Sequence, residues 1–586
     1  MGTISDKLMR IINTKEDIRQ ALISKGYDVP TSIPFKEYAK MILDLPCNAD
    51  SFPDIEGIVA RYSASGLTNE QMAANPVWVD KTGNGHDIKL KNFSWKGMSG
   101  VGGYVQDFND FRNNATVDKI RIDEQGSNSI KVTILTTGIG DAIYIPKNIY
   151  QFNKSYFIKI SSEGYDEGDM ALSFYAPSTS TATTVTVSLN PNGVTEIPAI
   201  KEDDFLAVYI NVSGKVGSFT VEQLPLYPGA LVFDGVDDYG VCENFPILTK
   251  EKGYTVVALR QWITRGEIAQ GLVSNVKNWL KDGAFLLEYR NIQADHLNKP
   301  ISFGAIGSEM DLPHILTYQT SKSCNGVSIT TGNFEGTDVL HVGKLAPTNV
   351  GTCINAAIWE LVFLDHDATE EELTKIKDYF VKTYPWLFPY QAWTVVGKTN
   401  EDEDRATIAN ITGNGNDLVL SNFGFIEGSG YNEEGQYAGY LVTDGVDDKI
   451  ASSDFKMGKD FTIVGDWKFI DNKKSGTGLV KGSSFYIYNT MIGLDLYINS
   501  GSVKNSLDGI KSINAACSDG RAYDRNWNEI LANTGNVVGS GGILEVSSSG
   551  GRFDRIAFKN LAIYPRILSK DDCIKAYNYL QTLKSK

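Results

Sequence analysis

The sequence Leu-Val-Phe-Asp-Gly-Val-Asp-Asp at residues 231–238 returns as Leu-Val-Thr-Asp-Gly-Val-Asp-Asp at residues 441–448. Asp-Gly after an apolar run predicts a tight turn, because glycine accepts positive φ and aspartate tolerates it. The carboxylates that follow can accept backbone N–H bonds and keep the turn compact. A turn that occurs twice in nearly the same residues indicates a duplicated domain.

Four other segments repeat in the same order along the chain. The offset between the copies is 412 − 82 = 330 at the first repeated segment and 444 − 234 = 210 at the Asp-Gly turn. The first copy therefore carries about 120 extra residues, which are enough for a domain of their own. The repeated pairs are 82–87 with 412–417, 254–257 with 461–464, 271–273 with 478–480, and 361–372 with 561–572.

The chain of 586 residues is too long for one hydrophobic core. Its 56 glycines, 11% aromatic residues and 22% charged residues fit many short strands joined by turns. We predict a mainly β protein in four parts. These are a helical module at 1–46, a discontinuous first sandwich at 51–104 and 226–390, an inserted β-sandwich at 105–225, and a second sandwich at 391–586.

The inserted part alternates apolar and polar residues, which predicts period-two strands of a second kind of β-sandwich. It loosely resembles carbohydrate-binding modules. The apolar positions expected to face its core are Ile120, Ile122, Ile130, Val132, Ile134, Val185, Val187, Leu189, Leu206, Val208, Ile210, Val212, Phe219 and Val221.

The N-terminal part is expected to form two helices, an amphipathic one at 5–26 that ends at Gly26 and a second one at 35–45. Together they hold too few apolar residues to fold robustly alone. Two interpretations stay open from periodicity: an extension that caps the neighbouring domain, or a docking and oligomerisation module that becomes ordered on a partner.

Residues 13–26, Asn-Thr-Lys-Glu-Asp-Ile-Arg-Gln-Ala-Leu-Ile-Ser-Lys-Gly, are followed by Pro-Phe-Lys-Glu-Tyr-Ala at 34–39. This stretch resembles the N-terminal module of bacteriophage tail-fibre and head-fibre proteins. The resemblance implies attachment to the virion through residues 1–46, on capsid or tail proteins, and a location on the virion surface after assembly in the host cytoplasm. Parallel association of several copies would bury the apolar stripe of 5–26. That the oligomer is a homotrimer is implied by the same resemblance. A head fibre is favoured over a tail fibre, since the sequence shows no long shaft.

Both long copies resemble the laminin-G-like, concanavalin A-like lectin and glucanase superfamily. The residues that carry this resemblance are Thr-Gly-Asn-Gly-x-Asp at 82–87 and 412–417, the two Asp-Gly-Val-Asp-Asp turns, and the exit segment 562–572. The resemblance implies tandem jelly-roll sandwiches. Each copy is expected to close with a short helix, capped by Thr369 or Ser569 with an acidic residue three positions on.

Catalysis is not expected, although the superfamily includes glucanases. Those enzymes carry an E-x-D-x-x-E strand whose alternation directs carboxylates into the cleft, and this sequence has none. The acidic run 401–404 is consecutive, which favours a solvated loop. The five histidines lack metal-ligand spacing, so no catalytic residue and no cofactor is predicted.

The aspartates of the repeated turns are the candidates for a metal, since calcium prefers several oxygen ligands. The other interpretation is that their carboxylates only satisfy backbone donors in the turn. The candidate residues are Asp234, Asp237, Asp238, Asp444, Asp447 and Asp448.

Tryptophans are the natural candidates for stacking on sugar rings. Trp359 lies in an apolar strand and is expected in the core, whereas Trp95, Trp279 and Trp527 lie in turn-rich stretches and are better candidates for exposure. Packing remains the alternative for each of them.

The formal net charge of −16 argues against nucleic acid or an anionic membrane as a partner. Six scattered cysteines without a C-x-x-C pair predict no disulfide framework and assembly in a reducing cytoplasm. No signal peptide and no membrane-spanning run is apparent. Two functions stay open: a phage appendage whose lectin-like domains bind host-surface or mucosal glycans, and a free glycan-binding or glycan-degrading protein of the same superfamily.

Overall fold

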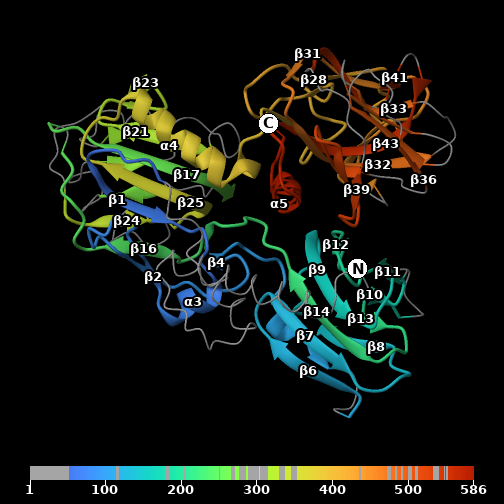
Figure 1. The fold of residues 1–586 in the computed structure, drawn as a ribbon. Coiled ribbons are helices and arrows are strands. Elements are labelled where there is room, and N and C mark those ends of the chain that lie inside the picture. The colour runs from blue at the N-terminus through green and yellow to red at the C-terminus, as the bar shows by residue number, and fades with distance from the viewer. Residues whose placement is uncertain are drawn as a thin grey trace, which may run out of the picture. The chain divides into compact units, whose positions relative to one another are not determined.

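The computed structural model describes residues 52–585 apart from gaps, the longest of which are 276–284, 288–301, 304–314, 329–336, 345–352 and 532–539. The helices expected at 5–26 and 35–45 lie outside the described residues. The larger compact unit comprises Gly57–Glu370 and Phe380–Lys586. It is built mainly of β-strands, as predicted (Figure 1). No helix among the described residues is long and apolar enough to cross a membrane.

The first sandwich packs two sheets around a core that includes Tyr62, Trp78 and Phe363. Strand β1 (Ile58–Ser63) pairs antiparallel with the central strand β25 (Asn355–Leu364). The first sheet runs β23 (Val327–Ser328), β22 (Ser323–Cys324), β21 (Leu316–Thr320), β17 (Thr255–Thr264), β25 (Asn355–Leu364), β15 (Leu231–Asp234) and β4 (Gly100–Val101). The second runs β2 (Val77–Trp78), β3 (Ile88–Lys91), β16 (Tyr239–Cys242), β24 (Leu340–Val342), β18 (Val273–Ser274), β19 (Phe285–Leu287) and β20 (Ser302–Phe303).

The second sandwich repeats this strand order, with β26 (Gln391–Thr394) in the place of β1 on the central strand β43. The tandem-sandwich prediction is therefore confirmed. One sheet runs β39 (Glu529–Leu531), β38 (Arg521–Asp524), β37 (Ile513–Cys517), β32 (Thr462–Asp471), β43 (Arg555–Tyr564), β30 (Tyr440–Val442) and β29 (Gly430–Asn432). The other runs β27 (Thr407–Ile408), β28 (Leu418–Ser421), β31 (Lys449–Met457), β40 (Ser540–Val546), β33 (Thr477–Lys481), β34 (Phe485–Asn489), β35 (Gly493–Ile498) and β36 (Asn505–Asp508).

The inserted part forms two five-stranded sheets of its own (Figure 1). One runs β11 (Val185–Ser188), β10 (Met170–Tyr175), β13 (Ala207–Val212), β8 (Asp141–Pro146) and β5 (Arg112–Asn113). The other runs β12 (Val194–Ile197), β9 (Tyr156–Glu163), β14 (Gly217–Gln223), β7 (Ser129–Ile134) and β6 (Ile120–Gln125). The predicted apolar positions line the core between the sheets, with one exception. Leu206 is 65% exposed, because strand β13 begins only at Ala207.

The α-helices within the described residues are short: α3 (Asn69–Ala74), α4 (Glu370–Thr383) and α5 (Lys570–Gln581). Helix α5 begins as predicted, because the Ser569 side chain accepts a hydrogen bond from the Asp572 N–H at 3.1 Å. This helix buries an apolar face that comprises Cys573, Ala576, Tyr577 and Leu580.

Candidate functional site

The Asp-Gly turn of the first sandwich is held by its own carboxylates. Gly235 has φ = 82°, as a turn of this kind requires. Asp234 Oδ1 accepts from the Val236 N–H at 2.8 Å, and Asp238 Oδ2 accepts from the Asp234 N–H at 3.0 Å. Asp238 Oδ1 accepts from Ser99 Oγ at 3.0 Å, so both oxygens of the buried carboxyl are engaged.

The turn of the second sandwich repeats these contacts. Asp444 Oδ1 accepts from the Val446 N–H at 2.7 Å. The oxygens of Asp448 accept from the Asp444 N–H at 2.8 Å and from Ser429 Oγ at 3.1 Å. Burial raises the pKa of Asp448 to about 6, and burial together with the charge of Asp234 raises that of Asp238 to about 7. A carboxyl with a raised pKa is a weaker cation ligand near neutral pH than an ordinary one.

These contacts agree with the interpretation of the aspartates as turn residues. Each turn brings three carboxylates together, with oxygens that lie within 4.8 Å of one another. The trio of the first copy is Asp234, Asp237 and Asp238, and that of the second copy is Asp444, Asp447 and Asp448. Asp237 and Asp447 are exposed. The bonds formed by the other aspartates account for the conformation without an ion, and calcium binding at the turns stays a prediction.

A pocket of about 380 Å³ lies elsewhere in the same compact unit. One wall comes from the inserted sandwich, and the other from the second sandwich with helix α5. The lining residues are Lys159, Asn192, Gly193, Val194, Glu222, Leu224, Pro225, Pro228, Asn526, Trp527, Asn528, Lys570, Asp571, Ile574, Lys575 and Asn578.

The pocket is rich in groups that hydrogen-bond to hydroxyls. Four of its lining residues are asparagines and three are lysines. One of the asparagines, Asn578, is only 3% exposed, and its Oδ1 has no hydrogen-bond partner among the described residues. A buried acceptor in this state is usually satisfied by water or a ligand. The chemistry of the lining suits a polyhydroxylated ligand with several donors and acceptors.

Trp527 contributes to this pocket, and its ring is packed, which is the alternative to exposure that the sequence left open. It is 2% exposed, because the indole packs edge-on against Tyr577 at 5.6 Å between ring centroids. Trp95 is half-buried, and its ring stacks on that of Phe93 at 4.9 Å between ring centroids. Trp359 is fully buried, as predicted, and Trp279 lies outside the described residues.

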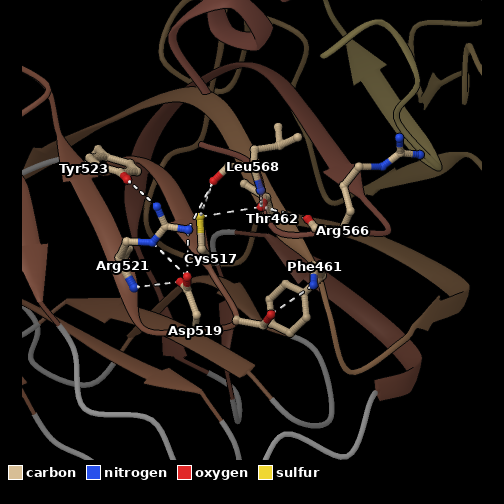
Figure 2. Close-up of polar contacts among 9 residues, drawn as sticks. Phe461, Thr462, Cys517, Asp519, Arg521, Tyr523, Arg566 and Leu568 are labelled. Carbon is tan, nitrogen blue, oxygen red and sulfur yellow. Dashed lines mark hydrogen bonds and ion pairs between the residues drawn. The ribbon is translucent and has the colours of Figure 1, made fainter. Parts of the chain in front are cut away.

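Helix α5 is positioned by Thr462 at the start of β32 (Figure 2). The Thr462 hydroxyl donates to the Arg566 carbonyl at 2.9 Å and accepts from the Leu568 N–H at 2.9 Å. It also lies 3.5 Å from Cys517 Sγ. The exit segment that leads into α5 is thereby fixed to the sheet, and with it Lys570 at the pocket wall.

Arg521 supports the same exit segment (Figure 2). Its guanidinium pairs with Asp519, at 2.8 Å from Nε and 2.7 Å from Nη2 to the same carboxylate oxygen. Nη2 also donates to the Leu568 carbonyl at 3.4 Å. In the first sandwich Thr255 acts as Thr462 does, donating to the His366 carbonyl at 2.8 Å and accepting from the Ala368 N–H at 2.7 Å.

The acidic run at 401–404 lies in a turn region, as the solvated-loop prediction requires. Asp402 accepts from the N–H and hydroxyl of Thr399, at 2.8 and 2.9 Å, and Asp404 pairs with Lys398 at 2.6 Å. These carboxylates are thus engaged in the local loop structure.

No protein-family model matches the chain, and no curated protein matches it. Solved structures similar to it include the Trypanosoma rangeli sialidase in complex with sialic acid, at 10% identity and a TM-score of 0.22, over 80% of this chain and 85% of that one. The tandem CBM22 domain of Paenibacillus barcinonensis Xyn10C is similar at 11% identity and a TM-score of 0.14, over 48% of this chain and 96% of that one. Likenesses this low carry no argument about the function of this chain.

Proposed function

We propose that this protein is a non-hydrolytic, glycan-binding appendage of a bacteriophage particle. Residues 1–46 anchor it to the virion as a homotrimer, on the head in preference to the tail. Its sandwiches are displayed outward on the virion surface, where they bind host-surface or mucosal glycans.

The observation that carries glycan binding is the pocket around Asn578. A buried, unpartnered amide oxygen in a lining of amides and amines suits the hydroxyls and amides of a saccharide. The lining also holds aliphatic surface, from residues such as Leu224 and Ile574, for the apolar face of a sugar ring.

Display on a particle explains how sites of modest individual affinity can attach the particle to a glycan-covered surface. Sites carried in many copies on one surface gain orders of magnitude in avidity without any new contact. The anchoring role rests on the resemblance of residues 13–39 to phage fibre modules. The preference for the head rests on the absence of a long shaft from the sequence.

The binding claim is tested with the full chain and its Asn578→Ala variant on a printed array of bacterial-surface and mucin oligosaccharides. Asn148→Ala, an exposed asparagine outside the pocket lining, is the matched control. We expect binding by the wild type and the control and a loss of about tenfold or more in the pocket variant, since one hydrogen bond to a buried polar group contributes about 1.5 kcal/mol. Equal binding by all three proteins would place the glycan elsewhere.

The non-hydrolytic claim is tested by incubating the protein with host capsular polysaccharide and measuring newly formed reducing ends. We expect no release above the buffer control. Release that disappears on mutation of one Asp/Glu pair would identify the chain as an enzyme instead.

A further inference from the structure

Three tyrosines lie on neighbouring strands of the inserted sandwich: Tyr144 on β8, Tyr209 on β13 and Tyr175 on β10. Tyr209 pairs in register with Tyr144, and Tyr175 pairs with Ala207 on the same strand as Tyr209. The ring centroids of Tyr144 and Tyr209 lie 5.4 Å apart, and those of Tyr175 and Tyr209 lie 5.2 Å apart. The three rings form one continuous aromatic row, which we call the tyrosine face.

The tyrosine face points away from the core of its own module. Side chains alternate along a strand, and the neighbours of the tyrosines on β8, β13 and β10 fill the core. Each of the three tyrosines is half-buried. The core neighbours are Ile143, Ile145, Val208, Ile210, Leu172 and Phe174.

Polar side chains share this face with the rings. Asn211 Nδ2 donates to Ser173 Oγ at 2.7 Å and to the Tyr175 hydroxyl at 3.4 Å. Ser173 Oγ lies 3.4 Å from Thr186 Oγ1 on the next strand. Asn211 Oδ1 is a buried acceptor without a hydrogen-bond partner among the described residues, and a buried acceptor in this state is usually satisfied by water or a ligand.

We propose that the tyrosine face is a second saccharide site, which binds an extended glycan chain along the row of rings. The C–H face of a pyranose packs on an aromatic ring while its hydroxyls reach the amide and hydroxyl groups beside it. Three adjacent strands span about 10 Å, which accommodates consecutive sugar units. A nucleic acid is disfavoured as the occupant, because the chain carries a net charge of −16.

This site rests on the proposed glycan-binding function but does not share residues with the pocket around Asn578. The pocket of about 380 Å³ suits a short saccharide segment, whereas a row of rings on a sheet suits a longer stretch of chain. Two sites of this kind on one protein would contact the same polysaccharide at separate points and strengthen attachment.

The test uses the full chain with Tyr209→Ala, which removes the central ring. Tyr209→Phe keeps the ring, and Leu206→Ala removes an exposed apolar side chain of the same module outside the face. Affinity is measured by calorimetric titration with the longest oligosaccharide that binds on the array. We expect Tyr209→Ala to weaken binding about tenfold, since one aromatic contact contributes about 1.5 kcal/mol, and both controls to bind as the wild type does.

A second measurement needs no variant. Tetranitromethane nitrates accessible tyrosines, and mass spectrometry then reports nitration of Tyr144, Tyr175 and Tyr209 with and without the oligosaccharide. Protection of these tyrosines supports the site. Unchanged nitration together with wild-type affinity in Tyr209→Ala overturns it, and if Asn578→Ala still loses binding, the proposed function stands without this second site. No binding of any oligosaccharide by the wild type contradicts both. Protection by a host surface protein but by no oligosaccharide also overturns the saccharide assignment.

Discussion

Ser99 donates a hydrogen bond from its Oγ to Asp238 Oδ1 at 3.0 Å, and this contact ties the loop before β4 to the Asp-Gly turn after β15. Ser429 and Asp448 make the same contact in the second sandwich at 3.1 Å. The turn that reveals the duplication in the sequence is therefore held in each copy by a buried carboxyl, whose protonation affects stability.

The first prediction concerns the pH dependence of this carboxyl. Burial and the charge of Asp234 raise the pKa of Asp238 to about 7, above its ordinary value of 3.8. The folded state therefore holds a proton that the unfolded state releases, so this group's contribution to stability falls as the pH rises from about 4 to about 7. Asp238→Asn has the hydrogen-bonding pattern of the protonated acid and removes this loss.

We expect Asp238→Asn to melt at a higher temperature than the wild type at pH 8 and at a similar temperature at pH 4. A difference of 1 kcal/mol corresponds to about 2–4 °C in a domain of this size. Calorimetry at the two pH values measures the difference in melting temperature. The control is Asp237→Asn, which changes an exposed carboxylate of the same turn. A variant that is less stable than the wild type at pH 8 would show that the ionised carboxylate stabilises the turn.

The second prediction concerns the threonine that fixes the exit segment. Thr462→Val keeps the shape of the side chain but leaves the Leu568 N–H without its acceptor. Loss of a buried hydrogen bond of this kind costs about 1–3 kcal/mol. Thermal denaturation measures the loss, and Thr462→Ser, which keeps the hydroxyl, is expected to lose less. A loss in Thr462→Ser as large as that in Thr462→Val would show that the hydroxyl stabilises the fold no more than the methyl group does.

The third prediction is that residues 105–225 fold by themselves. Both sheets of the inserted part take all their strands from residues 112–223, and their core is drawn from residues 105–226. The fragment, expressed alone, is expected to give one cooperative melting transition. The boundary would be wrong if the fragment showed no transition and the chain without it also failed to fold.

The sandwich architecture could be predicted from the sequence because its determinants are local. Gly235 and Gly445 must adopt positive φ, and period-two alternation sets the inward faces of the strands. The prediction for Leu206 was wrong because the apolar–polar alternation of the sequence begins one residue before strand β13 does. The turn-rich stretch around Trp527 left exposure and packing both open, and the contact with Tyr577 of helix α5 decides for packing.

The pocket and the tyrosine face could not be predicted in the same way. Lys159, Asn526 and Asn578 meet only through tertiary structure, and no spacing in the sequence links them. The sequence held a weak signal for the tyrosine face. Tyr144, Tyr175 and Tyr209 each alternate with apolar residues that fill the core, so their side chains lie on the outer side of the sheet. Aromatic residues in the outward phase of several strands indicate a binding surface only when the strand order is known.

The central claim is that this chain is carried on a phage particle. Antibodies raised against the fragment 105–225 are applied to purified particles from the producing host and located by electron microscopy. We predict label on the particle surface, at the head, and its loss from particles that carry the chain without residues 1–46. Particles without label, with the protein recovered free in the lysate, would contradict the account.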